Sequence, residues 1–477
     1  MNATASTTDR NPLVKYFDAL APARVRWVEK NRYYHRQLGK TFSFFIPRNR
    51  SVLEIGCGAG QLLASLKPSR GVGIDLSPKM IQVARERHPH LEFHVDNLED
   101  LQLDEKFDYV VVSDVLGFLY DVQRSLENLQ RVCSPHTRVV ISYYNFLWEP
   151  VLNAGERLGL KARQPTQNWL GAADVANLLD LAGFEVIRKT SRLLLPKRVL
   201  LLSLLCNRFL VNLPLFRHLA LTFVIVARPK PKPRTDQPSC SVVIPARNER
   251  GNVEEAIRRT PQLGRHTEII FVEGNSDDGT AEEIQRAITA HPERDLKFIP
   301  QGSGRGKGDA VRKGFAAATG DVLMILDADL TVPPEELPKF YNALITGHGD
   351  FIHGSRLVYP MQDQAMRFLN ILGNKFFSLA FTYLLDQRFK DTLCGTKVLY
   401  RSDYNHIAAN RSYFGDFDPF GDFDLIFGAA KLNLKIIEVP IHYFARTYGT
   451  TNISRFKHGW LLLRMSVFAM RKMKFIE

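Results

Sequence analysis

One local pattern recurs along the chain and constrains its fold more than any other feature: a short apolar run, a glycine-rich or acidic turn, then a helix-like segment. Ser51–Ile55 precedes the glycines of Gly56-Cys-Gly-Ala-Gly60, and Val322–Leu326 precedes Asp327-Ala-Asp329. Such apolar runs are typical of strands buried on both faces, and strands that alternate with helices form parallel sheets. The sequence therefore predicts an α/β protein with doubly wound sheets.

A proline-rich basic stretch divides the chain of 477 residues. In Arg228-Pro-Lys-Pro-Lys-Pro-Arg-Thr-Asp-Gln-Pro238, proline occupies every second position from 229 to 233. A run of this kind favours extended polyproline geometry and cannot join a sheet interior. We expect a Rossmann-like first domain at residues 13–228, a linker at residues 229–238 and a second α/β domain at residues 239–477.

The formal net charge is +13, and the five cysteines are scattered without a CxxC pair. The charge favours a polyanionic partner such as a nucleotide, a phosphate or an anionic membrane. The cysteine spacing fits a reduced cytoplasmic compartment better than a disulfide scaffold or a zinc site. Residues 1–12 are polar, and no uninterrupted apolar run approaches the roughly 20 residues of a membrane span. We therefore expect no signal peptide and no membrane-spanning helix.

The first half carries a candidate cofactor site. Residues 13–47 have a helical pattern rich in aromatic and basic residues, and they predict a lid before the first strand. Glycines at alternate positions let a backbone approach a ligand that a Cβ atom would exclude. Later apolar runs end at Asp75, at Asp96 and at Ser113-Asp114, and the first of these acids has the position to bind a ribose diol. A nicotinamide-binding fold is the alternative, but its G-x-G-x-x-G pattern would need a glycine at Gln61.

On the motifs VLEIGCGAG and GIDLS and the acid Asp96, residues 13–228 resemble the class I methyltransferases that use S-adenosylmethionine. No signature base identifies the methyl acceptor, because methyl transfer requires mainly alignment of the reacting atoms. Tyr143, Tyr144 and Asn145 either face the acceptor or pack beneath the cofactor. The resemblance implies that Glu54, Gly56, Gly58 and Gly60 line the methionine and ribose side, that Asp75 binds the ribose, that Asp96 and Asn97 bind the adenine edge, and that Ser113 and Asp114 lie near the methyl group.

The second half carries two carboxylates, Asp327 and Asp329, at the end of a predicted strand, and Pro333-Pro334-Glu335 then predicts the start of a helix. Open α/β sheets bind ligands at the carboxyl ends of strands, and Mg²⁺ typically uses one or two carboxylates together with substrate phosphates. An ordinary aspartate turn is the alternative interpretation. The loop Gly302–Gly308 is glycine-rich and basic, so it suits a phosphate, but it lacks the spacing of a P-loop.

The motifs VVIPARNE, GKGDAV, ILDADLTVPPEEL and KDTLCGTKVLYR make residues 239–477 similar to family 2 glycosyltransferases of the GT-A fold, and most of all to the polyprenyl-phosphate (dolichyl-phosphate) mannose and glucose synthases. This resemblance implies GDP-mannose or UDP-glucose as donor, Mg²⁺ or Mn²⁺, a polyprenyl-phosphate acceptor, and a single displacement with inversion. It implies Pro245, Arg247, Glu249 and Glu273 around the base and ribose, Gly306 and Lys307 at the phosphates, Asp327 and Asp329 at the metal and diphosphate, and Arg356 and Arg446 at the leaving nucleotide.

The acceptor decides whether a general base is needed. The oxygen of a lipid phosphate is already anionic, whereas a sugar hydroxyl must lose its proton to a carboxylate. Asp391 is the first candidate for that base and Asp424 the second, with a structural role as the alternative for both. His442 is a candidate metal ligand, but an ordinary structural histidine on a strand is the preferred interpretation. The family pattern is altered at VEGNSDDGT, at Thr331 in place of a frequent glutamine, and at Ile426 in place of a glutamate.

Two apolar segments carry basic residues and suit a membrane surface. For Leu193–Pro214 we expect a cap packed on the sheet, with membrane contact as the alternative. For Trp460–Lys474 we weigh packing on its own domain equally with peripheral contact at the inner face of the plasma membrane. The C-terminal basic residues Lys457, Arg464 and Arg471 are seven apart, so they predict one stripe along a helix.

The sequence thus indicates a bifunctional transferase, with two rivals. In one, the glycosyltransferase adds sugar to a saccharide or lipid hydroxyl in surface-glycan synthesis. In the other, the first half is a non-catalytic module that binds the cofactor or docks a partner. Nucleic-acid binding is suggested by charge alone, and no aromatic and basic recognition motif supports it, so we expect no nucleic-acid partner.

Overall fold

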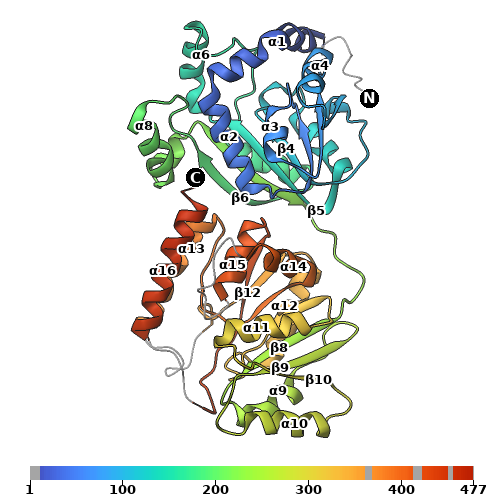
Figure 1. Cartoon of the computed structure of the whole chain (residues 1–477), viewed down its shortest axis with the longest axis vertical. Coiled ribbons are helices and arrows are strands. Elements are labelled where there is room, and N and C mark those ends of the chain that lie inside the picture. Colours follow the sequence, from blue (N-terminus) through green and yellow to red (C-terminus); the bar gives the residue numbers. More distant parts are fainter. Residues whose placement is uncertain (1–10, 360–367, 412–421, 450–454, 476–477) are drawn as a thin grey trace. The chain divides into compact units, whose positions relative to one another are not determined.

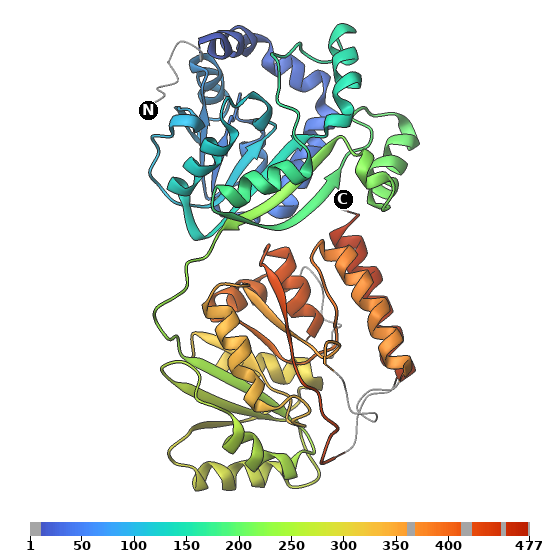
Figure 2. The same cartoon turned by 180° about the vertical axis from the view of Figure 1, so that it is seen from behind.

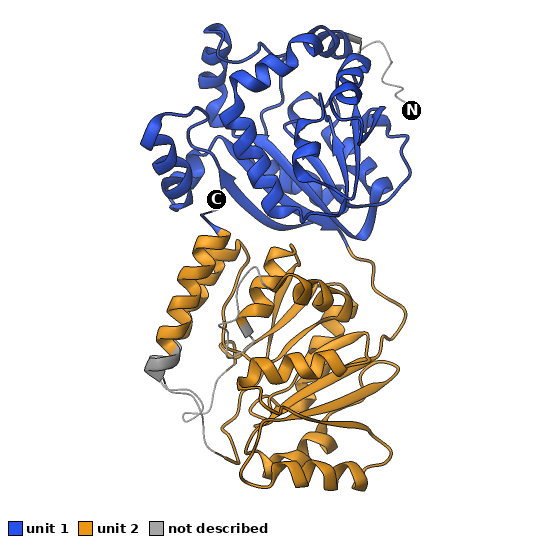
Figure 3. Cartoon of the chain, viewed as in Figure 1, with its two compact units in different colours: residues 1–230, 474–477 blue, residues 231–473 orange. Residues whose placement is uncertain are grey.

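The computed structural model describes residues 11–359, 368–411, 422–449 and 455–475. Residues 1–230 and 474–477 form one compact unit, and residues 231–473 form a second (Figure 3). Phe420 and Gly421, shortly before the altered position Ile426, and residues 450–454 lie outside the described residues.

The sheet of the first unit has seven strands: β1 (Ser51–Ile55), β2 (Arg70–Asp75), β3 (Glu92–Val95), β4 (Phe107–Ser113), β5 (Cys133–Tyr144), β6 (Phe184–Arg192) and β7 (Thr222–Pro229). Their order is β3-β2-β1-β4-β5-β7-β6. The first five strands run parallel, whereas β7 is antiparallel to β5 and to β6. The strand order reverses between β1 and β4, and this switch point is where open α/β sheets bind ligands.

The helices of the first unit are α1 (Asn11–Lys30), α2 (Arg32–Phe45), α3 (Gln61–Leu66), α4 (Pro78–Arg87), α5 (Val122–Asn128), α6 (Glu149–Arg157), α7 (Ala172–Leu181) and α8 (Leu200–Leu204). Leu126 of α5 and Leu179 of α7 join the strand side chains in one apolar core, on the face seen in Figure 2. On the other face lie α2 and α3 (Figure 1), and Phe42 and Phe45 of α2 are fully buried. The helical pattern predicted for residues 13–47 is confirmed by α1 and α2.

The second unit repeats the architecture with β8 (Cys240–Ala246), β9 (Thr267–Glu273), β10 (Asp295–Pro300), β11 (Val322–Ile325), β12 (Phe351–Ser355), β13 (Lys397–Tyr400) and β14 (Ile436–Pro440). Their order is β10-β9-β8-β11-β13-β12-β14. β13 is antiparallel to both its neighbours, and the other pairs are parallel. The order reverses between β8 and β11, which places a second switch point there. The predicted α/β fold with two doubly wound sheets is therefore confirmed.

The helices of the second unit are α9 (Val253–Arg259), α10 (Thr280–Ala290), α11 (Gly306–Ala317), α12 (Leu337–Ile345), α13 (Phe368–Leu385), α14 (Arg401–Ala409), α15 (Asp422–Lys431) and α16 (Arg455–Met473). Ile257 of α9, Ile284 of α10 and Phe340 of α12 share one core with the strands. α16 lies beside α13 in both views (Figures 1 and 2). Within the described residues, no helix combines the length and the apolar content needed to cross a bilayer.

The expected cap at Leu193–Pro214 is wrong for most of its leucines. Leu193 and Val211 are buried, but Leu200, Leu201 and their neighbours are exposed. α8 and the residues after it are held to the unit by polar side chains. Few of their apolar groups are buried. The segment covers much less of the sheet than its apolar composition suggests.

Candidate functional site

The turn between β1 and α3 forms the centre of the candidate cofactor site in the first unit. Gly56, Gly58 and Gly60 have φ values of 67°, 52° and 78°, in the left-handed region that only glycine adopts readily. A Cβ atom on Gly56 would lie 2.5 Å from the side chain of Val115, and one on Gly60 would lie 2.7 Å from the ring of Phe93. The turn itself therefore requires glycines, and it lies at the switch point of the sheet.

Two predicted acids hold this turn through backbone amides. Asp75, at the end of β2, accepts hydrogen bonds from the amides of Gly58 at 2.9 Å and Ser77 at 3.0 Å. Glu54 accepts one from the amide of Leu63 at 2.9 Å, in the first turn of α3. Burial raises the pKa of Asp75, and it raises the pKa of Glu54 to about 8. A carboxylate has about four acceptor positions, so both acids retain capacity for a ligand.

Asp96 and Asn97 follow β3 at the same edge of the sheet. The amide of Asp96 donates to the carbonyl of Asp75 at 3.2 Å, and its carboxylate accepts from the amides of Asn97 at 2.7 Å and Gln102 at 3.2 Å. The side chain of Asn97 accepts from the amide of Glu99 at 3.1 Å. The structure brings both residues to the edge where Asp75 lies, and their contact with adenine stays a prediction.

A polar cluster lies where β4 and β5 end. Asp114 has a φ of 56°, and its carboxylate accepts from the hydroxyls of Tyr34 at 2.5 Å and Ser142 at 2.9 Å. The hydroxyl of Ser113 lies 3.2 Å from that of Ser142. Burial raises the pKa of Asp114 and the pKa of Tyr144, whose neighbour Asp114 adds to the rise. The cluster is thus partly buried, hydrogen-bonded and placed beside the glycine turn.

The three residues considered for the methyl acceptor have different environments. Tyr143 is buried and packs on Phe223, with ring centroids 5.8 Å apart. Asn145 is also buried, and its side-chain amide donates to the carbonyls of His218 and Ala220, both at 2.9 Å. Only Tyr144 therefore belongs to the polar cluster at the strand ends.

Arg24 of α1 is a site residue that the sequence did not single out. A Cβ atom on Gly58 would lie 3.7 Å from its guanidinium, and its charge opposes the burial that raises the pKa of Asp75 and of Glu54. In the described part of the chain, Arg24 makes no ion pair within 4 Å. Its position over the turn suits a ligand carboxylate. The signal available beforehand was only the basic and aromatic composition of residues 13–47.

In the second unit, the loops after β8 and β9 interlock. The amide of Asn248 donates to the hydroxyl of Ser276 at 2.9 Å, and the amide of Ser276 donates to Glu273 at 2.6 Å. Pro245 lies within β8, and Arg247 follows it with an exposed side chain. Parallel strands bring these predicted base and ribose ligands to one edge of the sheet.

Asp327 and Asp329 follow β11 at the same edge, and each is paired with a cation. Asp327 lies 2.5 Å from Lys307. Arg446 lies 2.7 Å from Asp329 and 3.0 Å from Glu249. Burial alone would raise the pKa of Asp327, but Lys307 more than offsets it and the pKa falls below its usual value. For Glu249 burial prevails over Arg446 and raises the pKa to about 7. The structure thus brings five predicted residues together.

The predicted phosphate loop becomes helical at Gly306, which has a φ of 80° and begins α11. Lys307 is in the first turn of this helix, where unpaired amides and the helix dipole favour anions. Gly395 lies so close that a Cβ atom there would collide with the carboxylate of Asp327 and with Lys307. The backbone around Gly395 therefore forms one wall of this site.

The candidate base Asp391 is completely buried and fully engaged. Its carboxylate accepts from Arg356 through Nε at 2.7 Å, through Nη2 at 2.8 Å and through the backbone amide at 3.0 Å. It also accepts from the side chain of Asn374 at 2.8 Å and from the amide of Leu393 at 3.0 Å. Burial would raise the pKa of Asp391, but Arg356 overrides it and holds the pKa well below its usual range. The geometry favours the structural role for this acid, and the same bonds occupy Arg356.

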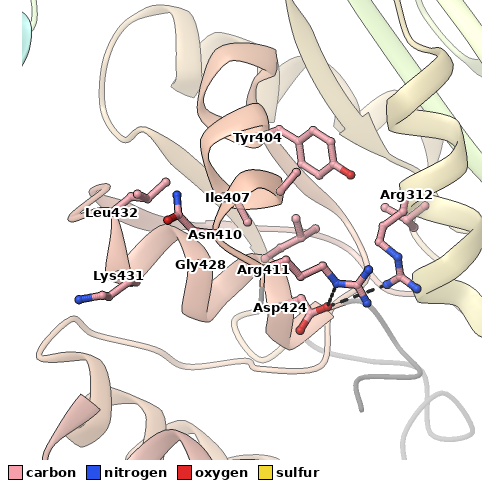
Figure 4. A pocket seen from close by; sticks show the side chains of 13 residues that line it. Arg312, Tyr404, Ile407, Asn410, Arg411, Asp424, Gly428, Lys431 and Leu432 are labelled. Atoms are coloured by element: carbon pink, nitrogen blue, oxygen red, sulfur yellow. Dashed lines mark hydrogen bonds and ion pairs between the residues drawn. The ribbon is translucent and has the colours of Figure 1, made fainter. Parts of the chain in front are cut away.

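Asp424, the second candidate base, has arginine partners of its own. It points into a cavity of about 190 Å³ between α11, α14 and α15, 3.1 Å from Arg411 and 3.9 Å from Arg312 (Figure 4). Gly308 and Tyr404 also line this cavity. Both candidate bases are therefore bound to arginines.

No group of three or more His, Cys, Asp and Glu side chains forms a metal cluster in the ranges that the structure describes. His442 lies beyond β14, 2.9 Å from Glu336, and its ring stacks on Tyr359 with centroids 4.3 Å apart. His442 was expected on a strand, but it lies beyond the end of β14 and pairs with Glu336. A cation at Asp327 and Asp329 would need further ligands from a substrate.

Two protein families match this chain. The profile of the family described as a methyltransferase domain matches residues 27–189, and that of glycosyl transferase family 2 matches residues 241–407. A solved S-adenosylmethionine-dependent methyltransferase of Thermotoga maritima aligns with 46% of this chain and 99% of its own, at 17% identity and a TM-score of 0.36.

Several curated relatives are sugar transferases. A dolichol-phosphate mannosyltransferase of Saccharomyces cerevisiae is 38% identical over 109 residues, which cover 22% of this chain and 40% of the relative. An undecaprenyl-phosphate 4-deoxy-4-formamido-L-arabinose transferase of Pectobacterium carotovorum is 28% identical over 226 residues, which cover 46% and 64%. This chain thus spans less than two thirds of each relative's length. The chain thus carries, in sequence order, one region that matches a methyltransferase domain and one that matches glycosyl transferase family 2.

Proposed function

We propose that the second unit transfers a hexose from a nucleotide sugar, GDP-mannose or UDP-glucose, to a polyprenyl phosphate, and that the first unit transfers a methyl group from S-adenosylmethionine. One observation carries the sugar transfer. Two carboxylates at the end of β11 lie at a switch point, each paired with a cation from another element, Lys307 of α11 and Arg446. The names of the lipid-phosphate transferases among the relatives support the acceptor.

The donor would lie across the edge formed by β8, β9 and β11. Pro245, Arg247, Glu249 and Glu273 would border its base and ribose. Its diphosphate would meet the first turn of α11, where the amides near Gly306 and the ammonium of Lys307 favour negative charge. When a diphosphate enters, Lys307 and Arg446 can exchange their protein carboxylates for phosphate oxygens.

Asp327 and Asp329 fit a hard divalent cation, because they offer carboxylate oxygens from two positions separated by one residue. Lys307 and Arg446, which now pair with them, would have to give way to it. Mg²⁺ or Mn²⁺ bound there would supply Lewis-acid stabilisation of the negative charge on the leaving diphosphate. Arg446, next to both Asp329 and Glu249, is the side chain that can follow the departing nucleotide.

The environment of Asp391 favours a phosphate acceptor over a hydroxyl. A general base must offer a free oxygen to a proton, and five donors occupy this carboxylate. A phosphate oxygen attacks the anomeric carbon as the bond to the diphosphate breaks, with inversion and without a proton transfer. In this proposal Arg356 and Asp391 are positioning residues that hold the backbone near Gly395 in place.

In the first unit, the proposed cofactor site is the glycine turn with Asp75, Asp96 and Arg24. Asp75 would bind the ribose hydroxyls, and Arg24 would bind the carboxylate of the methionine portion. Asp114 and Tyr144 would face the methyl acceptor from the ends of β4 and β5. This arrangement would align a nucleophile with the methyl carbon, which is the main requirement of methyl transfer.

Peripheral contact with the inner face of the plasma membrane is part of the proposal for the second unit. Trp460, Leu463 and Val467 of α16 are exposed, and Arg464 and Arg471 are exposed beside them. Met465 and Ala469 of the same helix are buried. One side of α16 packs on its own unit while the other presents apolar and basic groups together, as in helices that lie at a bilayer surface.

The test of sugar transfer uses the full chain with radiolabelled GDP-mannose or UDP-glucose, Mg²⁺ or Mn²⁺, and undecaprenyl phosphate. Label that enters the organic phase and is released by mild acid supports the proposal. Transfer only to a saccharide or lipid hydroxyl would support the rival instead. A control variant is Glu335→Gln. Glu335 forms an exposed ion pair with Arg259, so this substitution should leave sugar transfer unchanged.

The test of the first unit is calorimetry with S-adenosylmethionine on the wild-type chain and on Arg24→Gln. Binding that weakens in the variant supports the proposed cofactor site. Binding without methyl transfer to any extracted glycolipid would favour a non-catalytic module. Absence of binding to the wild type contradicts the proposal for this unit and leaves the sugar transfer untouched.

A further inference from the structure

The connection between β6 and β7 is longer than their pairing requires. The strands are antiparallel neighbours with Arg192 opposite Thr222, and such strands can be joined by a two-residue turn. Hairpin loops usually have about two to five residues, whereas this connection spans residues 193–221. This one contains α8 and three short helical segments, Leu205–Phe209, Leu210–Asn212 and Phe216–Leu219.

Residues 199–219, here called the leucine segment, expose an unusual amount of apolar surface. Ten of the 27 exposed large hydrophobic side chains in the described chain lie within it. Leu200, Leu201 and Leu215 are 87%, 74% and 76% exposed. Single exposed leucines are ordinary, whereas a concentration of them marks an interaction surface.

The exposure belongs to an anchored structure. The side-chain oxygen of Asn207 accepts from the amides of Leu194 at 2.7 Å and Leu195 at 2.9 Å, and its nitrogen donates to the carbonyl of Leu195 at 2.8 Å. At the other end, the indole of Trp148 donates to the carbonyl of Leu219 at 2.9 Å. Asn207, in the middle of the leucine segment, also donates to the hydroxyl of Tyr33 of α2 at 3.1 Å, so the segment is held to the first unit at its middle and at Leu219 while its apolar side chains stay exposed.

The charge around the leucine segment has one sign. No Asp or Glu occurs between Val186 and Thr235, and eleven Lys and Arg residues do. Each cation close to an anionic membrane surface adds to the attraction. The cations that border or interrupt the leucines are Lys197, Arg198, Arg208 and Arg217.

We propose that the leucine segment docks the first unit onto a lipid bilayer that carries anionic headgroups. The aliphatic side chains would enter the boundary between headgroups and acyl chains, and the flanking cations would contact the lipid phosphates. Protein interfaces are instead rich in tyrosine and tryptophan, with a polar rim. The surface lies wholly within the first unit, so the inference depends neither on the activity of either domain nor on α16.

The first test is cosedimentation of the full chain with vesicles of phosphatidylcholine, with and without phosphatidylglycerol. The test variant is the triple change Leu200→Glu, Leu201→Glu and Leu215→Glu. We expect it to lower the fraction bound to the anionic vesicles at least about tenfold. The control is Leu181→Glu with Val95→Glu, two residues that are 56% and 51% exposed elsewhere on this unit. The control should bind as the wild type does, and wild-type binding by the triple variant would overturn the proposal.

A second test reads insertion directly and separates it from any contact through α16. Cys206 lies in the leucine segment and is the one cysteine of five that is not buried, so an environment-sensitive dye can be attached to it. Anionic vesicles should shift its emission to the blue, and bromine-labelled lipids should quench it, also in a Trp460→Glu, Leu463→Glu variant. Dye emission that neither shifts nor is quenched contradicts the proposal. So does a triple variant that alters only the oligomeric state, because the surface would then join copies of this chain.

Discussion

The two units use acids at the same structural position, the carboxyl ends of parallel strands, but they neutralise them differently. In the first unit, Glu54, Asp75 and Asp96 accept hydrogen bonds from backbone amides. In the second, Asp327 and Asp329 are paired with the side-chain cations Lys307 and Arg446. An amide is held by the fold, whereas a long side chain can move to another partner.

This difference matches the charges of the proposed ligands. A site built on fixed amides is preorganised and needs little rearrangement to accept a cofactor with small net charge. A site closed by ion pairs must open them, and it does so favourably when the ligand brings both a cation and a diphosphate. The comparison predicts that sugar transfer responds strongly to charge changes and cofactor binding responds weakly.

The largest expected effect is loss of sugar transfer in the double variant Asp327→Asn, Asp329→Asn. Removing the cation site should lower the rate at least about 10³-fold, because Lewis-acid stabilisation contributes several kcal/mol and each 1.36 kcal/mol is tenfold. Binding of S-adenosylmethionine, measured by calorimetry on the same protein, should be unchanged. A near-wild-type rate would contradict the proposed cation site and the contrast between the two units.

Arg446→Gln should separate two roles of one side chain. Loss of its charge at the leaving nucleotide should lower turnover about 10²-fold, as removal of a preorganised electrostatic donor does. Because Arg446 also competes for Asp329, the Mn²⁺ concentration that gives half-maximal rate should fall. Titration of initial rate against Mn²⁺ measures both. A raised metal requirement would show that Arg446 supports the cation site instead of competing for it.

Asp75→Asn tests the amide-bound site. The variant keeps an oxygen that can accept from Gly58 or Ser77, but it loses the charge offered to a ribose diol. We expect the affinity for S-adenosylmethionine to fall about tenfold, the value of one hydrogen bond to a charged group. Sugar transfer should not change. Equal losses in both activities would mean that the units do not act independently.

Local patterns predicted the strand-end acids and the glycine turns, because each depends on neighbours in sequence. The turn at Gly56–Gly60 requires positive φ angles that adjacent residues reveal. The partners of these acids could not be predicted in the same way. Arg446 and Asp329 are 117 residues apart, and nothing in either motif specifies the pair.

Burial was also beyond the sequence. The residues next to Asp391 in the sequence are the same whether its carboxylate acts as a base or forms a buried ion pair. Only the packing of Arg356 and Asn374 around it distinguishes the two roles. Leu193–Pro214 shows the opposite error. Its apolar composition predicts packing, yet the fold leaves Leu200 and Leu201 exposed. Side-chain direction, and not composition, decides both cases.

The smallest expected effect is a pH dependence of stability from Glu54, which sharpens the contrast between amide-bound and cation-bound acids. Burial raises its pKa in the folded state from 4.5 to about 8. Below pH 4.5 the folded and unfolded chains both hold the proton, and this group's contribution to stability is fully present. As pH rises towards 8 the unfolded chain releases the proton first, so stability falls. Glu54→Gln keeps the acceptor for Leu63 but cannot titrate, and its melting temperature should fall less over this range than that of the wild type. Glu127→Gln, an exposed change on α5, should keep the wild-type slope. Parallel slopes for Glu54→Gln and the wild type would mean that the amide of Leu63 keeps Glu54 ionised.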